Sequence, residues 1–330
     1  MVGIYTITGE ASNQNYNVTF IDGSYEVYLD GLLFTSITGG YKVSVGTLAA
    51  ATEIVIPVTY KDKPILEIDN SFSVCTKLVK LTVPFVGAAL DGTGNVRFGY
   101  IFGASSLSNN GSYVPTSLRE VVVTGEVSIG YEAFYKCSGL TTISLPNVTS
   151  IEGYAFEFCR GLTEITLPKV TSIGNMAFYY CEVLTTITLH NVTSIGDFAF
   201  ESCIGLTSIT IHSDLTAVGR SAFSYCSKLT IYVEVSSKPT GWDTEWNRSG
   251  RPVVWGCTLS EDGSYVVSFT KTASSISNPT ATNGISAPYR EGYTFGGWAT
   301  VEGGTASYTA ANVNSAADDT VLYAIWIENE

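Results

Sequence analysis

The sequence predicts a mainly β protein in which stacked coils form a solenoid, with short helical or 3-10 turns at the corners. The first observation behind this prediction is a segment that occurs four times in succession between Ser128 and Thr216. The second is the strand-like alternation of apolar and polar residues within each copy. A single copy cannot bury its apolar side chains, whereas stacked copies cover each other.

The main strand of each copy lies near its end. In residues 140–145, Ile143 and Leu145 alternate with Thr142 and Ser144, so one face of the strand is buried and the other meets water. Pro146 ends the strand because proline has no N–H for the ladder. Successive strands are expected to pair in parallel, about 4.8 Å apart.

Each copy also contains a second short extended piece and a compact helical turn. The extended piece includes Ile151, and the turn holds Ala155 and Phe156 followed by Cys159. The turn position is a phenylalanine in five consecutive copies, which predicts an aromatic column along the solenoid: Phe134, Phe156, Phe178, Phe200 and Phe223.

The repeat motif SIGxxAFxxCxxLTxIxLPxxVT resembles the BspA-like family of bacterial leucine-rich repeats. The resemblance rests on five consecutive copies that keep Ala-Phe, Cys and Leu in phase. It implies a right-handed leucine-rich-repeat solenoid with a parallel sheet on its concave side. It also implies a secreted or cell-surface protein of the kind linked to adhesion.

The repeats are expected to span residues 46–257 as roughly eight coils, preceded by a β-rich N-terminal cap over residues 1–45. In the cap, Tyr5–Thr8 and Tyr16–Ile21 alternate like strands, and Asp22-Gly23 marks a turn. A cap is needed because the first coil of a solenoid otherwise exposes its core.

An insertion at Gly103–Pro115 interrupts the coils. Insertions in solenoids map to loops on one face, which is often the binding face. Tyr100 and Tyr113 are therefore candidate ligand contacts, although a surface loop without function has the same pattern.

The repeat decays from about residue 230, where a C-terminal cap is expected. Trp242, Trp246 and Trp255 lie close together in this part of the sequence. They could form an aromatic platform for sugars or simply cover the last coil. Both interpretations stay open from the sequence.

Residues 258–330 are expected to form a separate module. The segments GYTFGGW, residues 292–298, and VLYAIW, residues 321–326, resemble the internalin B-repeat, also called the Listeria–Bacteroides repeat. This resemblance implies a small β-grasp-like domain that serves as a spacer or adhesive module. Trp298 and Trp326 are expected in its core.

Five of the seven cysteines recur once in each copy of the repeat, at Cys137, Cys159, Cys181, Cys203 and Cys226. Cys75 has the equivalent place in an earlier coil, and Cys257 lies outside the series as a candidate free thiol. A redox or metal stack is one interpretation, and a column of small buried side chains is the other. None of the spacings is a zinc pattern.

The sequence does not indicate enzymatic chemistry, and no cofactor or metal is expected. His190 and His212 take the places that Pro146 and Pro168 hold in neighbouring copies, so they are substitutions at a corner. No nucleophile elbow, phosphate loop or metal-binding motif occurs. The protein is therefore predicted not to be an enzyme.

The candidate ligand-binding site consists of the outward positions of the concave strands. Short hydroxyls on a regular lattice suit weak, multivalent contacts with glycans or protein surfaces. β-branched hydroxyl residues also favour exposed strands without any ligand, and an ice-binding face would look similar. The candidate residues are Thr142, Ser144, Glu164, Thr166, Thr186, Thr188, Ser208 and Thr210.

Charge and composition limit the possible binding partners of the protein and its possible cellular location. The formal net charge of −13 argues against nucleic acid and anionic membranes. No apolar run is long enough for a membrane-spanning helix, and the N-terminus lacks a leader pattern, so we expect a fragment of a longer secreted or cell-surface protein. The predicted function is non-catalytic binding or adhesion to a host or neighbouring-cell protein or glycan. The alternative is a passive spacer in a larger surface protein.

Overall fold

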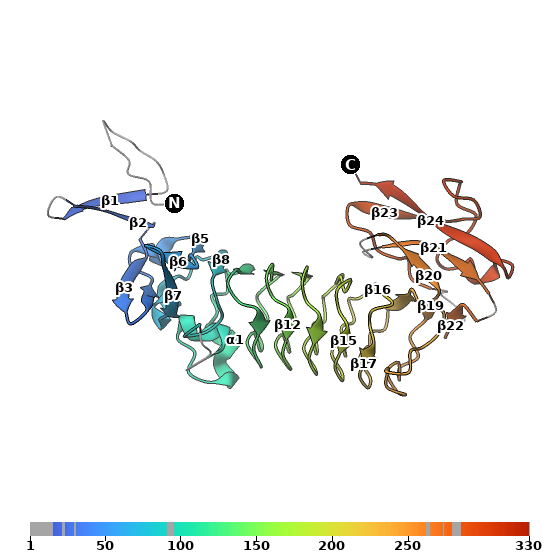
Figure 1. Ribbon diagram of the computed structural model, residues 1–330, viewed down its shortest axis with the longest axis horizontal. Helices are drawn as coiled ribbons and strands as arrows, with labels where there is room; N and C mark the ends of the chain where they lie inside the picture. Colours follow the sequence, from blue (N-terminus) through green and yellow to red (C-terminus); the bar gives the residue numbers. More distant parts are fainter. Residues whose placement is uncertain are drawn as a thin grey trace. The chain divides into compact units, whose positions relative to one another are not determined.

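The computed structural model describes residues 16–21, 24–29, 31–90, 96–261, 265–272, 274–278 and 285–329. The chain divides into two compact units, Met1–Glu126 and Val127–Glu330. Figure 1 colours the ribbon along the sequence and labels many of the strands and the helix α1. The predicted solenoid of parallel coils is confirmed. The predicted boundaries at residues 45 and 257 remain predictions, and the strand expected at Tyr5–Thr8 lies outside the described residues.

The first unit begins with antiparallel strands and continues into coils. β1 (Tyr16–Ile21) pairs with β2 (Ser24–Leu29), which confirms the strand predicted at that position. A second sheet has the order β3-β4-β7-β6 and consists of Leu33–Ile37, Gly40–Ser44, Lys63–Ile68 and Thr59–Tyr60. The coils contribute the parallel strands β5 (Glu53–Val55), β8 (Lys80–Val83) and β9 (Glu120–Val123).

Helical turns separate these strands. All are short, as a coil of so short a period demands, because an α-helix of several turns would not fit between two strands of one coil. Those of the first unit are η1 (Leu48–Ala50), η2 (Asn70–Val74), η3 (Phe98–Phe102), η4 (Leu107–Asn109) and α1 (Asn110–Tyr113).

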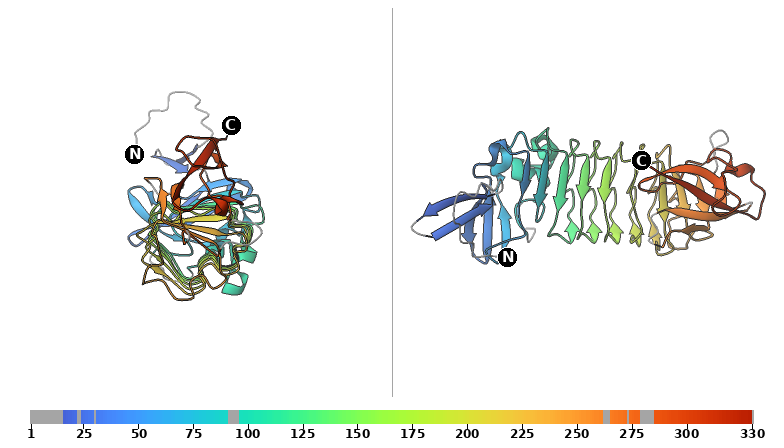
Figure 2. Two further views of the ribbon diagram at one scale, coloured as in Figure 1. Left: turned by 90° about the vertical axis from the view of Figure 1, so that its right-hand side faces the viewer. Right: turned by 90° about the horizontal axis from the view of Figure 1, so that it is seen from above.

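In the second unit, one sheet is built from four Ser-Ile pairs and one Ala-Val pair and stacks the coils in register. Ser128 lies opposite Ser150, which lies opposite Ser172. Beside this sheet, each threonine hydroxyl donates to the equivalent residue one coil earlier, as Thr171 does to the Thr149 carbonyl at 3.1 Å. Figure 2 shows these coils side by side in sequence order. The strands are β10 (Ser128–Ile129), β12 (Ser150–Ile151), β14 (Ser172–Ile173), β15 (Ser194–Ile195) and β17 (Ala217–Val218).

The predicted main strands form a second face of the coils, here called the strand face. β11 (Thr142–Ser144) pairs in parallel with β13 (Glu164–Thr166), and β16 (Ser208–Ile211) pairs with β18 (Thr230–Val233). The repeat predicts that every coil contributes a strand to one continuous parallel sheet. This is wrong for the coil between β13 and β16, because its residues 185–189 do not form a strand. This break falls where the C-terminal module begins to contact the face, as described below.

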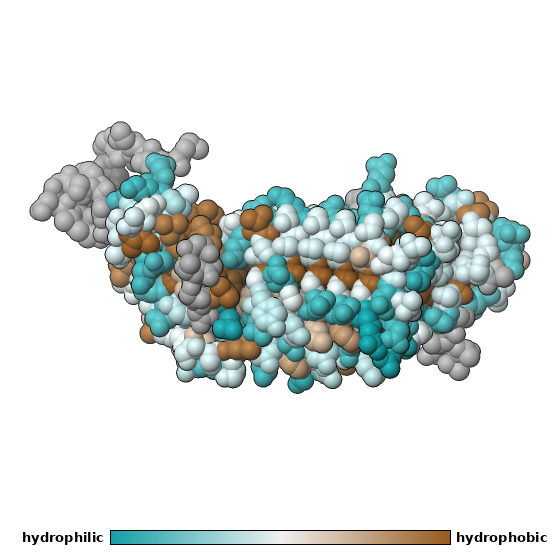
Figure 3. All heavy atoms as spheres, turned by 60° about the horizontal axis from the view of Figure 1, so that its bottom comes forward, coloured by the Kyte–Doolittle hydropathy of each residue, from teal (hydrophilic) through white to brown (hydrophobic). Residues whose placement is uncertain are grey.

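The phenylalanine column is confirmed. Neighbouring rings from Phe134 to Phe223 stack with centroids 5.1–5.6 Å apart and interplanar angles of 3–15°. All five side chains are fully buried. At the end of the column, the Trp246 ring meets Phe223 edge-on at 6.3 Å, so this tryptophan covers the last phenylalanine of the column. At the surface, a hydrophobic stripe follows the coils between two rows of paler side chains (Figure 3).

The cysteine series is a column of inter-coil hydrogen bonds. The thiols of Cys159, Cys181, Cys203 and Cys226 each donate to a phenylalanine carbonyl of the preceding coil at 3.0–3.2 Å. All seven cysteines of the chain are buried and none forms a disulfide. Burial raises the pKa of Cys159 and of Cys226 to about 12, so these thiols stay protonated and able to donate.

The turns beside this column contain left-handed residues other than glycine. Tyr154 and Phe158 both have φ of +59°, and the equivalent residues of the other coils match them. Such residues cost on the order of 1 kcal/mol each. The backbone N–H groups of Tyr154 and Phe158 donate to carbonyls of the next coil at 2.9 Å, which offsets that cost only when the neighbouring coil is present.

The C-terminal module is a four-stranded antiparallel sheet in the order β20-β21-β24-β23. Its strands are Cys257–Leu259, Val266–Lys271, Thr320–Glu328 and Tyr293–Ala299, and η5 (Val313–Ser315) packs against them. The strand β22 (Ile276–Ser277) is not part of this sheet. It pairs antiparallel with β19 (Val253–Trp255) of the coils.

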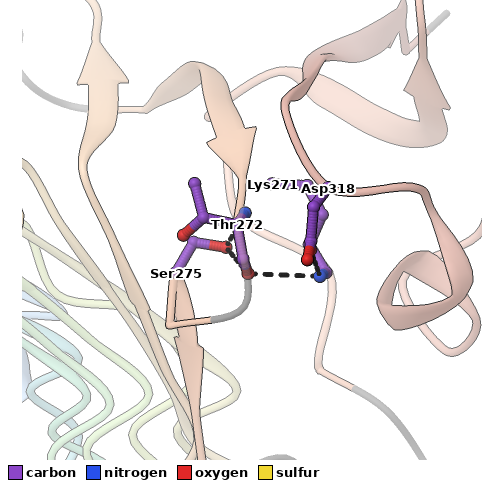
Figure 4. A network of polar contacts seen from close by, with 4 residues as sticks. All are labelled: Lys271, Thr272, Ser275 and Asp318. Carbon is purple, nitrogen blue, oxygen red and sulfur yellow. Dashed lines mark hydrogen bonds and ion pairs between the residues drawn. The ribbon is translucent and has the colours of Figure 1, made fainter.

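A small polar network holds the turn that redirects the chain from β21 to β22 (Figure 4). The Lys271 ammonium donates to Asp318 Oδ1 at 2.8 Å and to the Thr272 carbonyl at 3.2 Å. Ser275 Oγ accepts from the Thr272 N–H at 2.9 Å. Lys271 is buried, whereas the carboxylate of Asp318 is largely exposed. The pair therefore gives the buried ammonium a hydrogen-bond partner while the carboxylate stays hydrated.

A cysteine substitution should measure the inter-coil hydrogen bond. Cys181→Ala removes a thiol that donates to the Phe156 carbonyl at 3.2 Å, whereas the Cys137 thiol reaches only Tyr135 of its own coil, at 3.9 Å. Both sites are fully buried. We expect Cys181→Ala to lower the free energy of unfolding in urea by about 1 kcal/mol more than Cys137→Ala does. Equal losses would show that the thiol acts only through its volume.

Glu126, at the end of the first unit, predicts a pH dependence. Burial raises the pKa of its carboxyl group to about 7, although a backbone hydrogen bond from Val86 lowers that pKa in part. Its Oε2 has no hydrogen-bond partner among the described residues. The folded protein therefore holds this proton more tightly than the unfolded chain does, and stability falls as pH rises from about 4.5 to about 7.

Glu126→Gln removes this ionisation. We expect the variant to raise the free energy of unfolding by about 1 to 3 kcal/mol at pH 8 and to change it little at pH 4, measured by urea titration. Glu53→Gln, at an exposed position, is the control. An equal effect of Glu126→Gln at both pH values would contradict the account.

Candidate functional site

The open part of the strand face lies on three consecutive coils of the second unit. Thr142 lies opposite Glu164, and Ser144 lies opposite Thr166. Glu164 and Thr166 are exposed, while Thr142 and Ser144 are half-buried. The third coil adds Thr186 and Thr188, both half-buried. The structure thus brings six of the eight candidate strand residues together on one accessible face.

The C-terminal module supplies one further side chain to this face. Tyr289 forms a side-chain hydrogen bond with Thr186 and lies close enough to Glu164 to feel its charge. Burial is the main reason that the pKa of Tyr289 is raised, with the charges of Glu291 and Glu164 adding to it. With 40% of its surface exposed, this tyrosine forms an aromatic border beside the hydroxyl lattice.

The other two strand residues are not accessible. Ser208 is 5% exposed and Thr210 is 7% exposed, so their predicted role as solvent-facing ligand contacts is wrong. The reason is that the C-terminal module packs over this end of the face. The whole of β16 and the whole of β18 are buried, although half of their side chains point away from the coil interior.

The module and the last coils share one hydrophobic core. Tyr232 and Val254 occupy outward positions of the strand face, yet they cluster with Phe269, Trp298 and other buried residues of the module. At the edge of this cluster, the Tyr232 hydroxyl donates to the Ser286 carbonyl. The same contact thus buries the apolar side of the module and covers the outward side chains of the last coils.

Ser286 is the polar anchor of this contact. Its N–H donates to Thr230 Oγ1 at 2.8 Å, and its hydroxyl donates to the Lys228 carbonyl at 2.6 Å. A polar residue at the edge of an apolar contact stabilises that contact only if its polar groups have hydrogen-bond partners. Both groups of Ser286 are satisfied, so the position of residues 285–290 on the strand face is well specified.

The insertion of the first unit is more ordered than a loop. Asn110 is fully buried and its Oδ1 accepts from the Gly99 N–H at 2.7 Å, which ties the short helix α1 to η3. Tyr113 is 49% exposed and Tyr100 is half-buried. These two tyrosines stay candidate contacts of a separate surface.

An aromatic and cationic group on the turns escaped the sequence analysis. The Arg160 guanidinium lies 5.4 Å from the Phe158 ring centroid and 5.8 Å from that of Tyr180. Phe158 and Tyr180 are 5.3 Å apart. The signal that could have found it is an aromatic residue two positions after three of the five column phenylalanines, at Phe158, Tyr180 and Tyr225.

The described residues contain no group of three or more His, Cys, Asp or Glu side chains that could hold a metal ion. His212 Nδ1 lies 3.5 Å from Glu234 Oε2 at a corner. Of the helices in the described part of the chain, none is long and apolar enough to cross a membrane.

Parallel coils of nearly constant period, joined by short helical turns around a phenylalanine column, define a leucine-rich-repeat solenoid. Residues 108–233 match the family model of the BspA type leucine rich repeat region in six copies. Residues 260–325 match that of the Listeria-Bacteroides repeat domain. These two parts of the chain belong to those families, as the sequence motifs indicated.

Three solved structures are similar to this chain. A leucine rich cell surface protein from Faecalibacterium prausnitzii A2-165 is 28% identical, with a TM-score of 0.42 over 64% of this chain and 55% of its own. This chain therefore spans about half the length of that protein. The leucine rich repeat protein of T. pallidum is 21% identical, with a TM-score of 0.37 over 67% of this chain and 91% of its own.

A leucine-rich repeat protein from Bacteroides ovatus ATCC 8483 is 22% identical, with a TM-score of 0.36 over 70% of this chain and 71% of its own. No curated protein matches the sequence.

Removing one hydroxyl should test the contact between the module and the coils. Tyr232→Phe deletes the donor to Ser286, and we expect it to lower the free energy of unfolding by about 1 kcal/mol because the half-buried Ser286 carbonyl loses its partner. Tyr225→Phe, on a side chain that is 67% exposed, should change stability by less than about 0.5 kcal/mol. Equal effects in thermal unfolding would argue against the contact.

Proposed function

We propose that the protein is a non-catalytic binding or adhesion protein that acts outside the cell, and that the open strand face engages a protein or glycan surface of a host or neighbouring cell. The observation that carries the proposal is the accessible lattice formed by Thr142, Ser144, Glu164 and Thr166, with Tyr289 at its border. The two families matched are typical of interaction modules of bacterial surface proteins and agree with this function.

The physics of the lattice favours many weak contacts. A hydroxyl can both donate and accept, and a threonine loses little side-chain entropy when it is ordered. Glu164 adds an exposed carboxyl group, which can accept hydrogen bonds, to the face. A ligand that spans several coils gains from each of them, so its total affinity can be high although each contact is weak.

A passive spacer is the second candidate function. The core shared by Tyr232, Val254 and the module favours it, because a solenoid joined to its module through a packed core suits the display of something else. A spacer needs no accessible ligand face, so a binding experiment separates the two candidates.

An array experiment tests the strand face. The full chain is screened on glycan and extracellular-matrix protein arrays, and we expect a saturable signal that Thr166→Arg lowers at least tenfold. Thr166 is exposed on the face, so a long charged side chain there blocks close approach without disturbing the core. Thr300→Arg, at an exposed position of the module, is the matched control.

A signal that survives Thr166→Arg would contradict the proposed site. A full chain that binds nothing on either array would contradict the binding function and favour the spacer.

A further inference from the structure

A cavity of about 650 Å³ opens beside the C-terminal cap of the second unit. It lies between the segment that follows β18 and the turn before β22. Two indole rings line it, those of Trp246 and Trp255, with centroids 6.2 Å apart and planes at 72°. The remaining lining is almost entirely polar and includes Lys238, Glu245, Arg248 and Asn278. Its volume falls within the usual range for a small-molecule site.

The polar lining contains groups that no described residue satisfies. Among the residues that the structure describes, the Arg248 guanidinium and the Asn278 amide have no hydrogen bond or ion pair. The indole N–H of Trp246 likewise has no partner in the described part of the chain, and it is not fully enclosed. The cavity thus offers three sets of unused donors around two aromatic rings.

The local charge is opposite to that of the whole chain. The chain carries a formal net charge of −13, yet the cavity is lined by Lys238 and Arg248 and by one carboxylate. That carboxylate, Glu245, is already paired with Arg220 at 2.7 Å. Lys238 donates to the Trp242 carbonyl at 2.9 Å, which holds its ammonium at the cavity wall. The excess positive charge favours an anionic ligand.

We propose that this cavity binds an acidic sugar, a saccharide unit that carries a carboxylate. The ring C–H groups of the sugar would pack on an indole face by dispersion. The Asn278 amide and the Trp246 N–H would serve its hydroxyls, and the Arg248 guanidinium would pair with its carboxylate in a charge-assisted, bidentate contact. The site is distinct from the strand face, and neither depends on the other.

The composition of the wall argues against other ligands of this size. A quaternary ammonium ligand also stacks on tryptophans, but the cations at the wall would repel it. A purely apolar ligand would leave the Arg248 and Asn278 donors buried without partners, which is costly. A carboxylated sugar uses the rings, the amide and the cation together.

Paired saccharides test this assignment. The full chain is titrated with sialyllactose against lactose, and with digalacturonic acid against cellobiose, and binding is followed by tryptophan fluorescence and calorimetry. We expect the acidic member of at least one pair to bind at least tenfold more tightly than its neutral partner. The pair that responds identifies the source of the acidic sugar. Raised ionic strength should reduce that preference.

Matched variants locate the binding. Arg248→Ala, at an exposed and unpaired residue, should abolish the preference for the acidic sugar without changing the melting temperature. Lys77→Ala, which removes an exposed cation elsewhere, and Thr166→Arg should leave it intact. Failure of both acidic sugars to bind, equal binding of acidic and neutral sugars, or full binding by Arg248→Ala would each overturn the proposal.

Discussion

The structure depends on the hydrogen bonding of each coil to the next. A single coil has very short strands, left-handed turn residues and a buried thiol, and none of these is stable alone. Stacking supplies the partners: Ser150 pairs with Ser172, the Phe156 N–H donates to the Ala177 carbonyl, and the Cys181 thiol donates back to Phe156. The nearly constant period of the repeat keeps all three contacts in register, so the need to match the neighbouring coil constrains which residues each position can hold.

The same stacking produces a flat, regular face that a second domain can cover. At Thr142 and Glu164 the face carries small polar side chains and stays open. At Tyr232 and Val254 it carries large apolar ones and becomes the floor of the C-terminal module. A single face thus changes along its length from an accessible surface to a domain core, with Tyr289 at the border.

Periodicity predicted the coils, the strand positions of all but one coil and the phenylalanine column, because those features repeat and each copy supports the others. It could not predict the fate of Ser208 and Thr210, since their burial depends on a module distant in sequence. Tyr232, at the position that holds Thr166 in an earlier coil, was the available signal. The thiol hydrogen bonds were also missed, because a buried cysteine has the same pattern whether or not it donates. The cavity at Trp246 could not be predicted either, because its lining residues come from segments that are separate in the sequence.

Tyrosine nitration of the intact protein, mapped by mass spectrometry, tests most directly whether the module closes one end of the strand face and leaves the other open. Tyr289 is 40% exposed and Tyr232 is fully buried. We expect tetranitromethane to modify Tyr289 under native conditions and to modify Tyr232 only after unfolding. Modification of Tyr232 in the folded protein at a rate similar to that of Tyr289 would show that the module does not cover these coils.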